Sequence, residues 1–426
     1  MQECRNSVVR ISALFFLPLW CLLKVMKTSK LSYFVYVFTL GMLCAFAPMC
    51  SDLYLPSMPS IMDYFQTSPS LVQSSLTASF LGLAVGQLII GPVSDAYGRI
   101  LPLYASLVIF TVTSFLCAIS DSVVFFIAMR FFQGLSAAGG IVLTRSIACD
   151  KFKGNELTSF MAFLMSINSL APILAPIVGS FIISFAPWQV IFYVLVGWGL
   201  LLILATKLFV PESLPADKRQ ANIKSSLLLL KVELFNPKYM LVALSLASIM
   251  GGFFSYLAAS PFVFQVIYGM TPFGYSCTFA FISVCISLTG ASAGRLSRKY
   301  GEESVVKGAY FIMFSAAVLM LIEALIVPDN YLFVLLTLAV YCSMMAVSQA
   351  AGFGIVMSFK KGGAGAASGL FGVLYFLFGS MVSPFVGIMG ENSMLPLGIN
   401  LLSCVIVAII LLKIALSGRE KNEKTA

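Results

Sequence analysis

The sequence contains no histidine, and only 10% of its residues are charged. Without histidine, an imidazole proton relay and the most common metal ligand in proteins are both excluded. The ten cysteines include no C-x-x-C pair, which argues against a thiolate metal site. Neither an H-E-x-x-H motif nor a phosphate-binding loop is present, so zinc hydrolysis and ATP-driven pumping are not supported. We therefore expect neither an enzyme nor a protein that holds a metal or a cofactor.

Polar surface is also scarce. Hydrophobic residues make up 60% of the 426-residue chain, and its mean hydropathy is +0.99, which leaves too little polar surface to coat a globule in water. Apolar runs of about 20 residues recur, and each is long enough to cross about 30 Å of hydrocarbon as a helix. The sequence therefore predicts an all-α membrane protein with twelve transmembrane helices, near 32–56, 71–92, 101–119, 123–147, 157–183, 188–210, 238–264, 272–294, 304–326, 331–357, 364–389 and 394–416.

The charges in the predicted connections are sorted by sign. If the first span starts in the cytoplasm, the outer connections contain no Lys or Arg and hold the acids Asp63, Asp121, Asp329 and Glu391. The inner connections then hold Arg99, Arg145, Lys151, Lys153, Lys218, Arg219, Lys224, Lys231, Arg298, Lys299, Lys307, Lys360 and Lys361. By the positive-inside rule, both termini are predicted to be cytoplasmic. The net charge of +9 is then explained by the basic cytoplasmic connections and their contact with anionic membrane lipids. No nucleic-acid partner is expected.

The first thirty residues do not fit this scheme easily. The apolar run Ile11–Leu23 is too short to span comfortably and contains Pro18. No small-residue cleavage pattern follows it, so a signal peptide is not favoured either. We interpret residues 1–30 as a cytoplasmic N-terminal segment, and Met26 is an alternative start of translation.

The chain divides into two similar halves. The longest interior polar segment, 211–237, separates a predicted N-terminal six-helix bundle (31–210) from a C-terminal one (238–416), which is followed by a cytoplasmic tail (417–426). "GPVSDAYG" (91–98) after the second span matches "GRLSRKYG" (294–301) after the eighth at four of eight positions. Two pseudo-symmetric bundles are typical of secondary transporters. Within the linker, residues 227–235 are either an interfacial helix or a simple tether.

Several motifs, taken in order, resemble one family. "GPVSDAYGR" (91–99) is similar to the loop signature between spans two and three of the major facilitator superfamily, and "RFFQG" (130–134) to its span-four signature. "APILAPIVGS" (171–180) is similar to its span-five antiporter signature, with Ala175 and Ser180 in place of glycines. "DLYLPSMP", "PESLP" and "GAASGLFG" (365–372) narrow the resemblance to drug:proton antiporters of the Bcr/CflA type. The resemblance implies the twelve-span facilitator fold.

The loop motif has a physical interpretation. Gly91 and Gly98 are predicted to permit tight turns and close helix approach. Asp95 is expected to pair with a helix N-terminus or a basic residue across the bundle interface, and Arg99 with C-terminal carbonyls. Such contacts would latch the halves in the outward-open state and make this a gating loop. The alternative is a short polar turn that serves topology alone.

Arg130 is the one basic residue that the predicted spans place well inside the membrane on the outer side. A charge in hydrocarbon costs at least about 2.5–3.5 kcal/mol, so it should face the bundle interior and find a partner. Asp52, near the end of the first span, is predicted at a similar depth. The resemblance places Asp52 and Arg130 at proton-coupling positions, with Gln133 and Gly134 completing the span-four motif. A purely structural salt bridge is the alternative.

The span-five prolines, Pro172 and Pro176, each remove an amide donor and are predicted to bend that helix, while Gly179 allows close packing. The resemblance associates such a bend with antiport, although a kink without directional meaning is the alternative. Glu323, in span nine, is expected to extend its carboxylate to the outer interface.

These observations favour a proton-coupled antiporter of the bacterial inner membrane that exports small amphipathic molecules or drugs. The alternative is a dedicated exporter of one metabolite, such as a nucleoside, an amino acid or a siderophore. Aromatic side chains are expected to line the substrate cavity, with Tyr36, Tyr54, Tyr256 and Phe376 as candidates. The expected partners are protons, the small-molecule substrate and membrane lipids, and the chain is expected to be a monomer.

Overall fold

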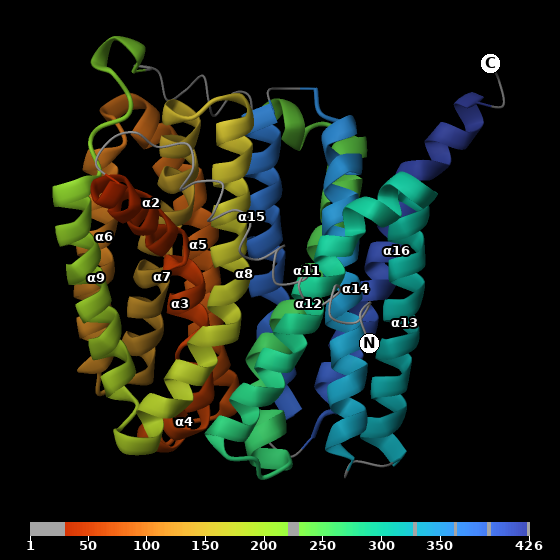
Figure 1. Ribbon diagram of the computed structural model, residues 1–426. Helices are drawn as coiled ribbons and strands as arrows, with labels where there is room; N and C mark the ends of the chain where they lie inside the picture. Colours follow the sequence, from red (N-terminus) through yellow and green to blue (C-terminus); the bar gives the residue numbers. More distant parts are fainter. Residues whose placement is uncertain (1–29, 220–229, 327–329, 362–363, 390–392, 424–426) are drawn as a thin grey trace, which may run out of the picture.

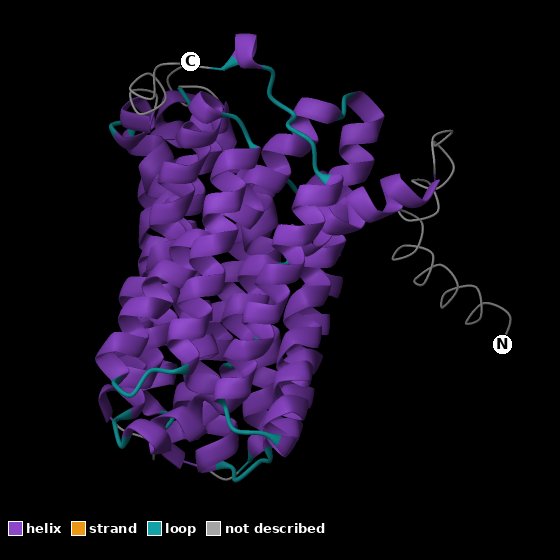
Figure 2. Ribbon diagram, turned by 90° about the vertical axis from the view of Figure 1, so that its left-hand side faces the viewer, coloured by secondary structure: helices purple, strands orange, loops and turns teal. Residues whose placement is uncertain are grey.

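The computed structural model describes residues 30–423 apart from 220–229, 327–329, 362–363 and 390–392. Most of the helices run along one common direction, and the loops gather at the two ends of the molecule (Figure 2). The N-terminal segment and the alternative start at Met26 lie outside the described residues.

The N-terminal half precedes the linker (Figure 1). Its elements are α2 (Lys30–Cys44), α3 (Phe46–Asp52), the 3₁₀ turn η1 (Leu55–Ser57), α4 (Met58–Phe65), α5 (Pro69–Tyr97), α6 (Ile100–Ala118), α7 (Val123–Lys151), α8 (Gly154–Phe185) and α9 (Gln189–Phe209). A short 3₁₀ turn, η2 (Ala216–Lys218), begins the linker.

The C-terminal half begins after the linker. Its elements are α11 (Pro237–Phe262), the π-helical turn η3 (Val263–Ile267), α12 (Pro272–Tyr300), α13 (Glu302–Ile326), α14 (Tyr331–Ser358), α15 (Ala364–Val382), the 3₁₀ segment η4 (Ser383–Met389) and α16 (Leu395–Glu423). The last helix continues beyond the predicted span end at residue 416.

The described residues contain eleven single helices that are long and apolar enough to cross a membrane, and a bent pair (Tyr33–Cys44 with Phe46–Phe65) passes the same test as a twelfth. No strand occurs among them. The prediction of an all-α membrane protein with twelve spans is therefore confirmed. The lengths of the apolar runs predicted the number of spans correctly, because turns separate one run from the next.

The first span differs from its prediction. It was expected to end at residue 56, but the chain continues through η1 and α4 to Phe65. Pro56 does not end the span, because η1 begins at Leu55 and proline fits the first turn of a helix, where its missing N–H would have no partner. Asp52 consequently lies far from the end of the span rather than close to it, and Asp63 belongs to α4 rather than to a loop.

The two glycines of the loop motif also differ. Gly98 is the predicted turn residue, since it ends α5 with φ of 90° and ψ of 169°, a conformation that is essentially restricted to glycine. The predicted turn at Gly91 is wrong. Gly91 and Pro92 both lie inside α5, where the hydrogen bonds of a long apolar helix outweigh their weak helix propensity.

Close packing inside the N-terminal half depends on glycines of α5 and α7. A Cβ atom at Gly82 would collide with the backbone oxygen of Phe131, and one at Gly134 would collide with the backbone of Ser79. The two helices are therefore in backbone contact. This places the Arg130 motif of α7 directly against α5.

The two ends of the molecule differ in charge. We use "basic end" for the end that carries the α5–α6 and α12–α13 connections, with Arg99, Lys151, Lys153, Arg298 and Lys299, and "opposite end" for the other. The start of α2 and the end of α16 both lie toward the basic end, which is uppermost in Figure 1.

Candidate functional site

Asp52 is a buried carboxylate at the interface between the two halves. It is the last residue of α3, and its side chain is 5% exposed. Ser51 donates a hydrogen bond to its Oδ1 at 2.6 Å. The turn η1, which directly follows it, contacts α11 and α12 of the C-terminal half, and Gln265 of η3 donates a hydrogen bond to Pro56 of this turn. Asp52 therefore lies next to the C-terminal half.

Arg130 is fully buried and faces the interior of the N-terminal half. Its Nη1 donates to the backbone oxygen of Cys50 at 3.1 Å and also contacts the amide oxygen of Gln133. Its guanidinium carbon lies 4.2 Å from the centre of the Tyr54 ring, a favourable cation–π distance. The charge predicted to need a partner has thus found backbone and amide oxygens and an aromatic face.

The two candidate proton-coupling residues do not form an ion pair. Among the described residues, no salt bridge joins Asp52 to Arg130. Arg130 instead contacts Cys50 and Tyr54, which stand two residues to either side of Asp52 in the chain. In this helical segment that spacing turns the carboxylate away from the face that Arg130 touches. The alternative of a structural salt bridge between them is therefore contradicted.

Gln133 extends the buried polar network. Its Nε2 donates to Ser114 Oγ on α6 at 2.7 Å, while its Oε1 accepts from Arg130. The span-four motif therefore links α3, α7 and α6 inside the N-terminal half. Gly134, next in the chain, provides the backbone contact with α5 described above.

Arg99 is surrounded by carboxylates of its own half. Its Nε donates to Asp150 of α7 at 2.9 Å, and its Nη1 donates to Asp95 at 2.5 Å and to Ser94 Oγ at 2.8 Å. The expected contact with helix C-terminal carbonyls is replaced by these side-chain partners. Within the described chain, neither Asp95 nor Arg99 makes a hydrogen bond or ion pair to the C-terminal half. The predicted latch across the interface is therefore not engaged in this structure.

Glu212 is a functional candidate that the sequence analysis missed. Its carboxylate accepts from the backbone N–H groups of Arg99 at 2.9 Å and Ile100 at 3.2 Å, at the start of α6. It also accepts from its own neighbours Ser213 and Leu214, each at 3.0 Å. Burial alone would raise the pKa of Glu212, but these four backbone donors outweigh it and lower the pKa below the ordinary 4.5. The "PESLP" motif, which contains Glu212, was the available signal.

The span-five motif contributes to the interface between the halves. Ser276 of α12 donates to the backbone oxygen of Pro176 at 2.8 Å, and Gly179 lies in backbone contact with Leu53, where a Cβ atom would collide. Pro172 and Pro176 both lie inside α8. The close packing predicted at Gly179 is confirmed, and its partner is the segment that follows Asp52.

The described hydrogen bonds between the halves lie toward the opposite end. Gln265 of η3 donates to the backbone oxygen of Pro56 at 3.1 Å, and Thr77 of α5 donates to Ser383 at 3.4 Å. With the Ser276–Pro176 bond, these are the three that join the halves in the described part of the chain. In Figure 1, α8 and α12 approach each other at the lower end and diverge upward. The halves are therefore in contact at the opposite end.

The four aromatic residues predicted to line one cavity do not share a site. Tyr54 packs inside the N-terminal half under Arg130, and the ring of Tyr36 lies 4.6 Å from the ammonium of Lys151, toward the basic end. Tyr256 is buried in α11 of the C-terminal half. Tyr36 and Tyr54 thus contact different cations of the N-terminal half, and Tyr256 belongs to the other half.

Phe376 belongs to an aromatic cluster between the halves. Phe80 of α5 stacks on Phe254 of α11 with ring centres 4.1 Å apart, and Phe376 of α15 lies 5.7 Å from Phe254. Sequence reasoning missed Phe80 and Phe254, because one phenylalanine among 37 carries no signal of its position. This cluster is the structure's apolar contact surface at the centre of the interface.

Two further polar side chains, Glu323 and Ser292, lie inside helices of the C-terminal half. Glu323 was expected to extend to the interface, but it is 5% exposed and lies on the buried face of α13 with Met320 and Met313. Neither of its carboxylate oxygens has a hydrogen-bond partner among the described residues.

Ser292 stands in a G-x-S-x-G run (290–294), but it lies inside α12 with its hydroxyl donating to the backbone oxygen of Thr289 at 2.7 Å. It is therefore not the strand-to-helix nucleophile of a hydrolase.

Known proteins identify the family. The family model of the Major Facilitator Superfamily matches residues 31–384. The chain belongs to the Major Facilitator Superfamily. It is 38% identical to the MFS-type transporter YdgK of Bacillus subtilis over 367 residues, which cover 85% of this chain and 90% of the relative. It is 28% identical to the bicyclomycin resistance protein homolog of Haemophilus influenzae over 89% of this chain and 95% of the relative.

The fold of this facilitator is also found in solved structures. The crystal structure of a D-xylose–proton symporter matches with a TM-score of 0.70 at 18% identity, over 90% of this chain and 96% of the symporter. An identity this low shows the shared fold alone. As a member of the superfamily, the chain is a multi-pass membrane transporter, and its drug-resistance relatives support a drug exporter within that family.

Proposed function

We propose that this chain is a proton-coupled antiporter of the bacterial inner membrane that exports small amphipathic molecules by alternating access. The observation that carries the proposal is the position of Asp52, a buried carboxylate between the two halves with no cationic partner among the described residues. The printed name of the Haemophilus influenzae relative, which refers to bicyclomycin resistance, supports a drug as the exported molecule.

The surroundings of Asp52 supply the chemistry. Low-polarity surroundings favour the protonated form of a carboxyl, whereas water or a nearby cation favours the ionised form. A neutral Asp52 can be enclosed between the halves at little cost, but an ionised one would have to be enclosed without a counter-charge. The halves therefore change conformation with a proton or a substrate at this site, and not with a bare carboxylate. Because the site must carry either a proton or a substrate when the halves move, protons and substrate are exchanged across the membrane in opposite directions.

The contacts between the halves suggest the stage of the cycle. The three hydrogen bonds between them lie toward the opposite end, and the charged groups of the basic end are bonded within their own half. We assign this arrangement to the form that opens at the basic end, which the positive-inside rule places in the cytoplasm. In the other form, Asp95 and Arg99 would latch the halves.

The proton gradient supplies the free energy. One proton entering for each substrate expelled contributes about 2.3 kcal/mol for every 100 mV of membrane potential, in addition to the pH gradient. A neutral substrate would use the whole of this contribution. Asp52 is a single buried acid in the segment next to the C-terminal half, which supports an exchange of one proton.

The experiment uses inside-out membrane vesicles that contain the full chain and a fluorescent reporter of the pH gradient. Amphipathic dyes and antibiotics, nucleosides and amino acids are added in turn, and a transported compound dissipates the gradient. We expect Asp52→Asn to abolish this proton flux while the purified variant still binds the compound. Asp63→Asn is the matched control, because Asp63 is an exposed acid of the same segment.

Three outcomes would count against the proposal. Full compound-driven proton flux in Asp52→Asn would remove Asp52 from the coupling mechanism. Loss of flux in Asp63→Asn as well would show that the effect is not specific to the buried acid. Response to one metabolite class alone, with no response to amphipathic drugs, would replace the broad exporter by a dedicated one.

A further inference from the structure

A hollow lies on the outer flank of the C-terminal half, away from the interface. A cavity of about 620 Å³ opens between α13 and α16 near the basic end. The two helices contact each other and further helices of their own half, and in Figure 1 they stand at the side of the molecule furthest from α9. The lining residues are Lys307, Tyr310, Phe311, Phe314, Ile409, Leu412, Lys413, Leu416 and Ser417. This hollow therefore faces the lipid bilayer, not the transport pathway.

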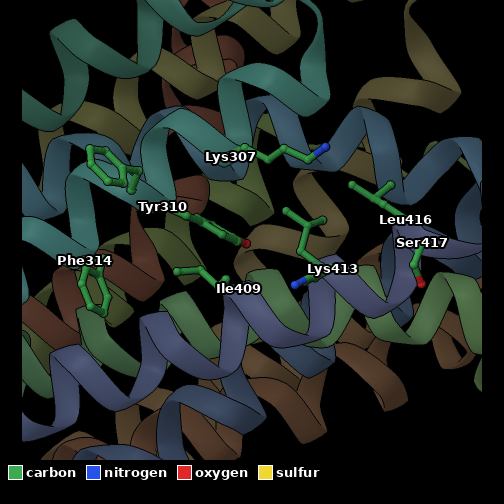
Figure 3. A pocket seen from close by; sticks show the side chains of 9 residues that line it. Lys307, Tyr310, Phe314, Ile409, Lys413, Leu416 and Ser417 are labelled. Atoms are coloured by element: carbon green, nitrogen blue, oxygen red, sulfur yellow. The ribbon is translucent and has the colours of Figure 1, made fainter. Parts of the chain in front are cut away.

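Two ammonium groups belong to this hollow, one from each helix. Figure 3 shows Lys307 on α13 and Lys413 on α16, with Leu416 between them. Lys307 lies about one turn from the start of α13, at the basic end. Lys413 lies about 27 Å from the start of α16 at Leu395, which is at the opposite end, at 1.5 Å per residue. Since the hydrocarbon core is about 30 Å thick, both groups stand at the level of lipid phosphates.

Neither lysine is strongly engaged by the protein. Lys307 has one acidic neighbour, Glu303, at 3.9 Å in a solvent-exposed pair, and such pairs contribute little. Lys413 is exposed and forms no salt bridge among the described residues. Ser417 uses its hydroxyl proton on the backbone oxygen of Ile414, and Tyr310 bonds to Ser245. The donors that the hollow offers to a ligand are therefore the ammonium of Lys413 and that of Lys307, whose ion pair with Glu303 is weak.

The part of the hollow further from the basic end is apolar. Phe311 is 70% exposed and, with Phe314 and Ile409, lines the hollow one to two helical turns deeper than the lysines. Figure 3 shows Phe314 and Ile409 at one end and Leu416 and Ser417 at the other. A negative headgroup at the lysines would place a hydrocarbon chain along these residues. The arrangement matches a phospholipid in polarity and in direction.

We propose that the hollow between α13 and α16 binds one anionic phospholipid, with its phosphate between Lys307 and Lys413 and an acyl chain against Phe311, Phe314 and Ile409. Basic pockets between transmembrane helices on the cytoplasmic side are suited to anionic headgroups. A zwitterionic lipid carries its own cation and gains less from two lysines. By binding both helices, the lipid stabilises the flank of the C-terminal half that does not contact the N-terminal half.

The test compares lipid binding to the purified full chain by native mass spectrometry, with phosphatidylglycerol and phosphatidylethanolamine as probes. We expect Lys307→Gln/Lys413→Gln to weaken phosphatidylglycerol binding at least tenfold. The control, Lys299→Gln/Lys360→Gln, removes two exposed lysines from the same end and should bind like the parent. Equal binding by the two double variants, or equal binding of both lipids by the parent, would overturn the proposal.

A second measurement locates the acyl chain. In Phe314→Trp, the added tryptophan fluorescence should be quenched more by brominated phosphatidylglycerol than by brominated phosphatidylethanolamine at the same mole fraction. The parent's own three tryptophans give the background. Glycerophosphoglycerol, the water-soluble headgroup, should not displace the lipid. Equal quenching by both lipids, or full displacement by the headgroup alone, would contradict a phospholipid site.

Discussion

The guanidinium of Arg130 donates a hydrogen bond to the backbone oxygen of Cys50 at 3.1 Å and lies over the ring of Tyr54 at 4.2 Å. It thereby holds the segment that carries Asp52 on both sides without touching the carboxylate. Residues of one rigid segment move together, so a shift of Arg130 or its partners changes the position of Asp52 relative to the C-terminal half. Arg130 is thus suited to positioning Asp52 and not to neutralising it.

Arg130→Lys is expected to reduce proton-coupled export about tenfold or more while the protein remains folded. An ammonium is a compact charge and does not reproduce the planar group that serves Cys50, Gln133 and the Tyr54 ring together. Compound-driven dissipation of the pH gradient in inside-out vesicles measures the effect. Arg145→Lys, an exposed position on the same helix, should export normally. Unchanged export in Arg130→Lys would show that a simple positive charge suffices.

Gly98→Ala is expected to destabilise the N-terminal half by roughly 1–3 kcal/mol, because an alanine is strained in the glycine-only backbone conformation at this position. An added Cβ would also lie close to the Glu212 and Arg219 side chains. Gly91→Ala is the matched control, since Gly91 is helical and its nearest neighbour would be at ordinary contact distance, 3.9 Å. Thermal unfolding of the two purified variants makes the comparison, and equal melting temperatures would refute the assignment of the turn.

Glu212 should make the anchoring of the linker depend on pH. Its pKa is lower in the folded chain than the ordinary 4.5, so its contribution is complete above that value and is lost as the pH falls through the lowered pKa. Limited proteolysis of the linker should therefore accelerate only below about pH 4.5. Glu212→Gln should be cleaved quickly at pH 7 and show no such acceleration. A variant as resistant as the parent at pH 7 would mean that the cap on α6 does not hold the linker.

Glu323→Leu is expected to stabilise the chain and to leave export intact. A buried polar group without a hydrogen bond costs about 1–3 kcal/mol, and both oxygens of Glu323 are in this position among the described residues. The melting temperature of the purified variant should rise, and the vesicle assay should give parental proton flux. Loss of flux would place a second essential acid in the C-terminal half and would contradict coupling through Asp52 alone.

The fold was largely predictable because hydrophobic length is a direct requirement of the bilayer. Each apolar run is long enough to span, and the positions of twelve spans followed from that alone. The first span was predicted too short, because its predicted end at residue 56 falls inside a 3₁₀ turn that continues into α4. The turn at Gly91 failed for a related reason, since a local helix breaker has little effect inside a long helix held by the membrane.

The sequence was sufficient to predict which residues of the site are buried, but not which partners they contact. Burial of Asp52 and Arg130 follows from the cost of placing charges in hydrocarbon, and both are buried. Their separation does not follow from that cost, because a guanidinium can also be held by a backbone oxygen, an amide oxygen and an aromatic face. The cap that Glu212 places on α6 joins residues more than a hundred positions apart, and no local pattern encodes such a contact.

The three hydrogen bonds between the halves, at Pro56, Pro176 and Ser383, all join uncharged groups. Separation at the opposite end therefore breaks no ion pair, and each of these hydrogen bonds contributes only about 0.5–1.5 kcal/mol to holding the halves together there. Dissolved salt screens charges and leaves such bonds unaffected. The hydrogen-bonded contact at the opposite end should accordingly be nearly indifferent to ionic strength.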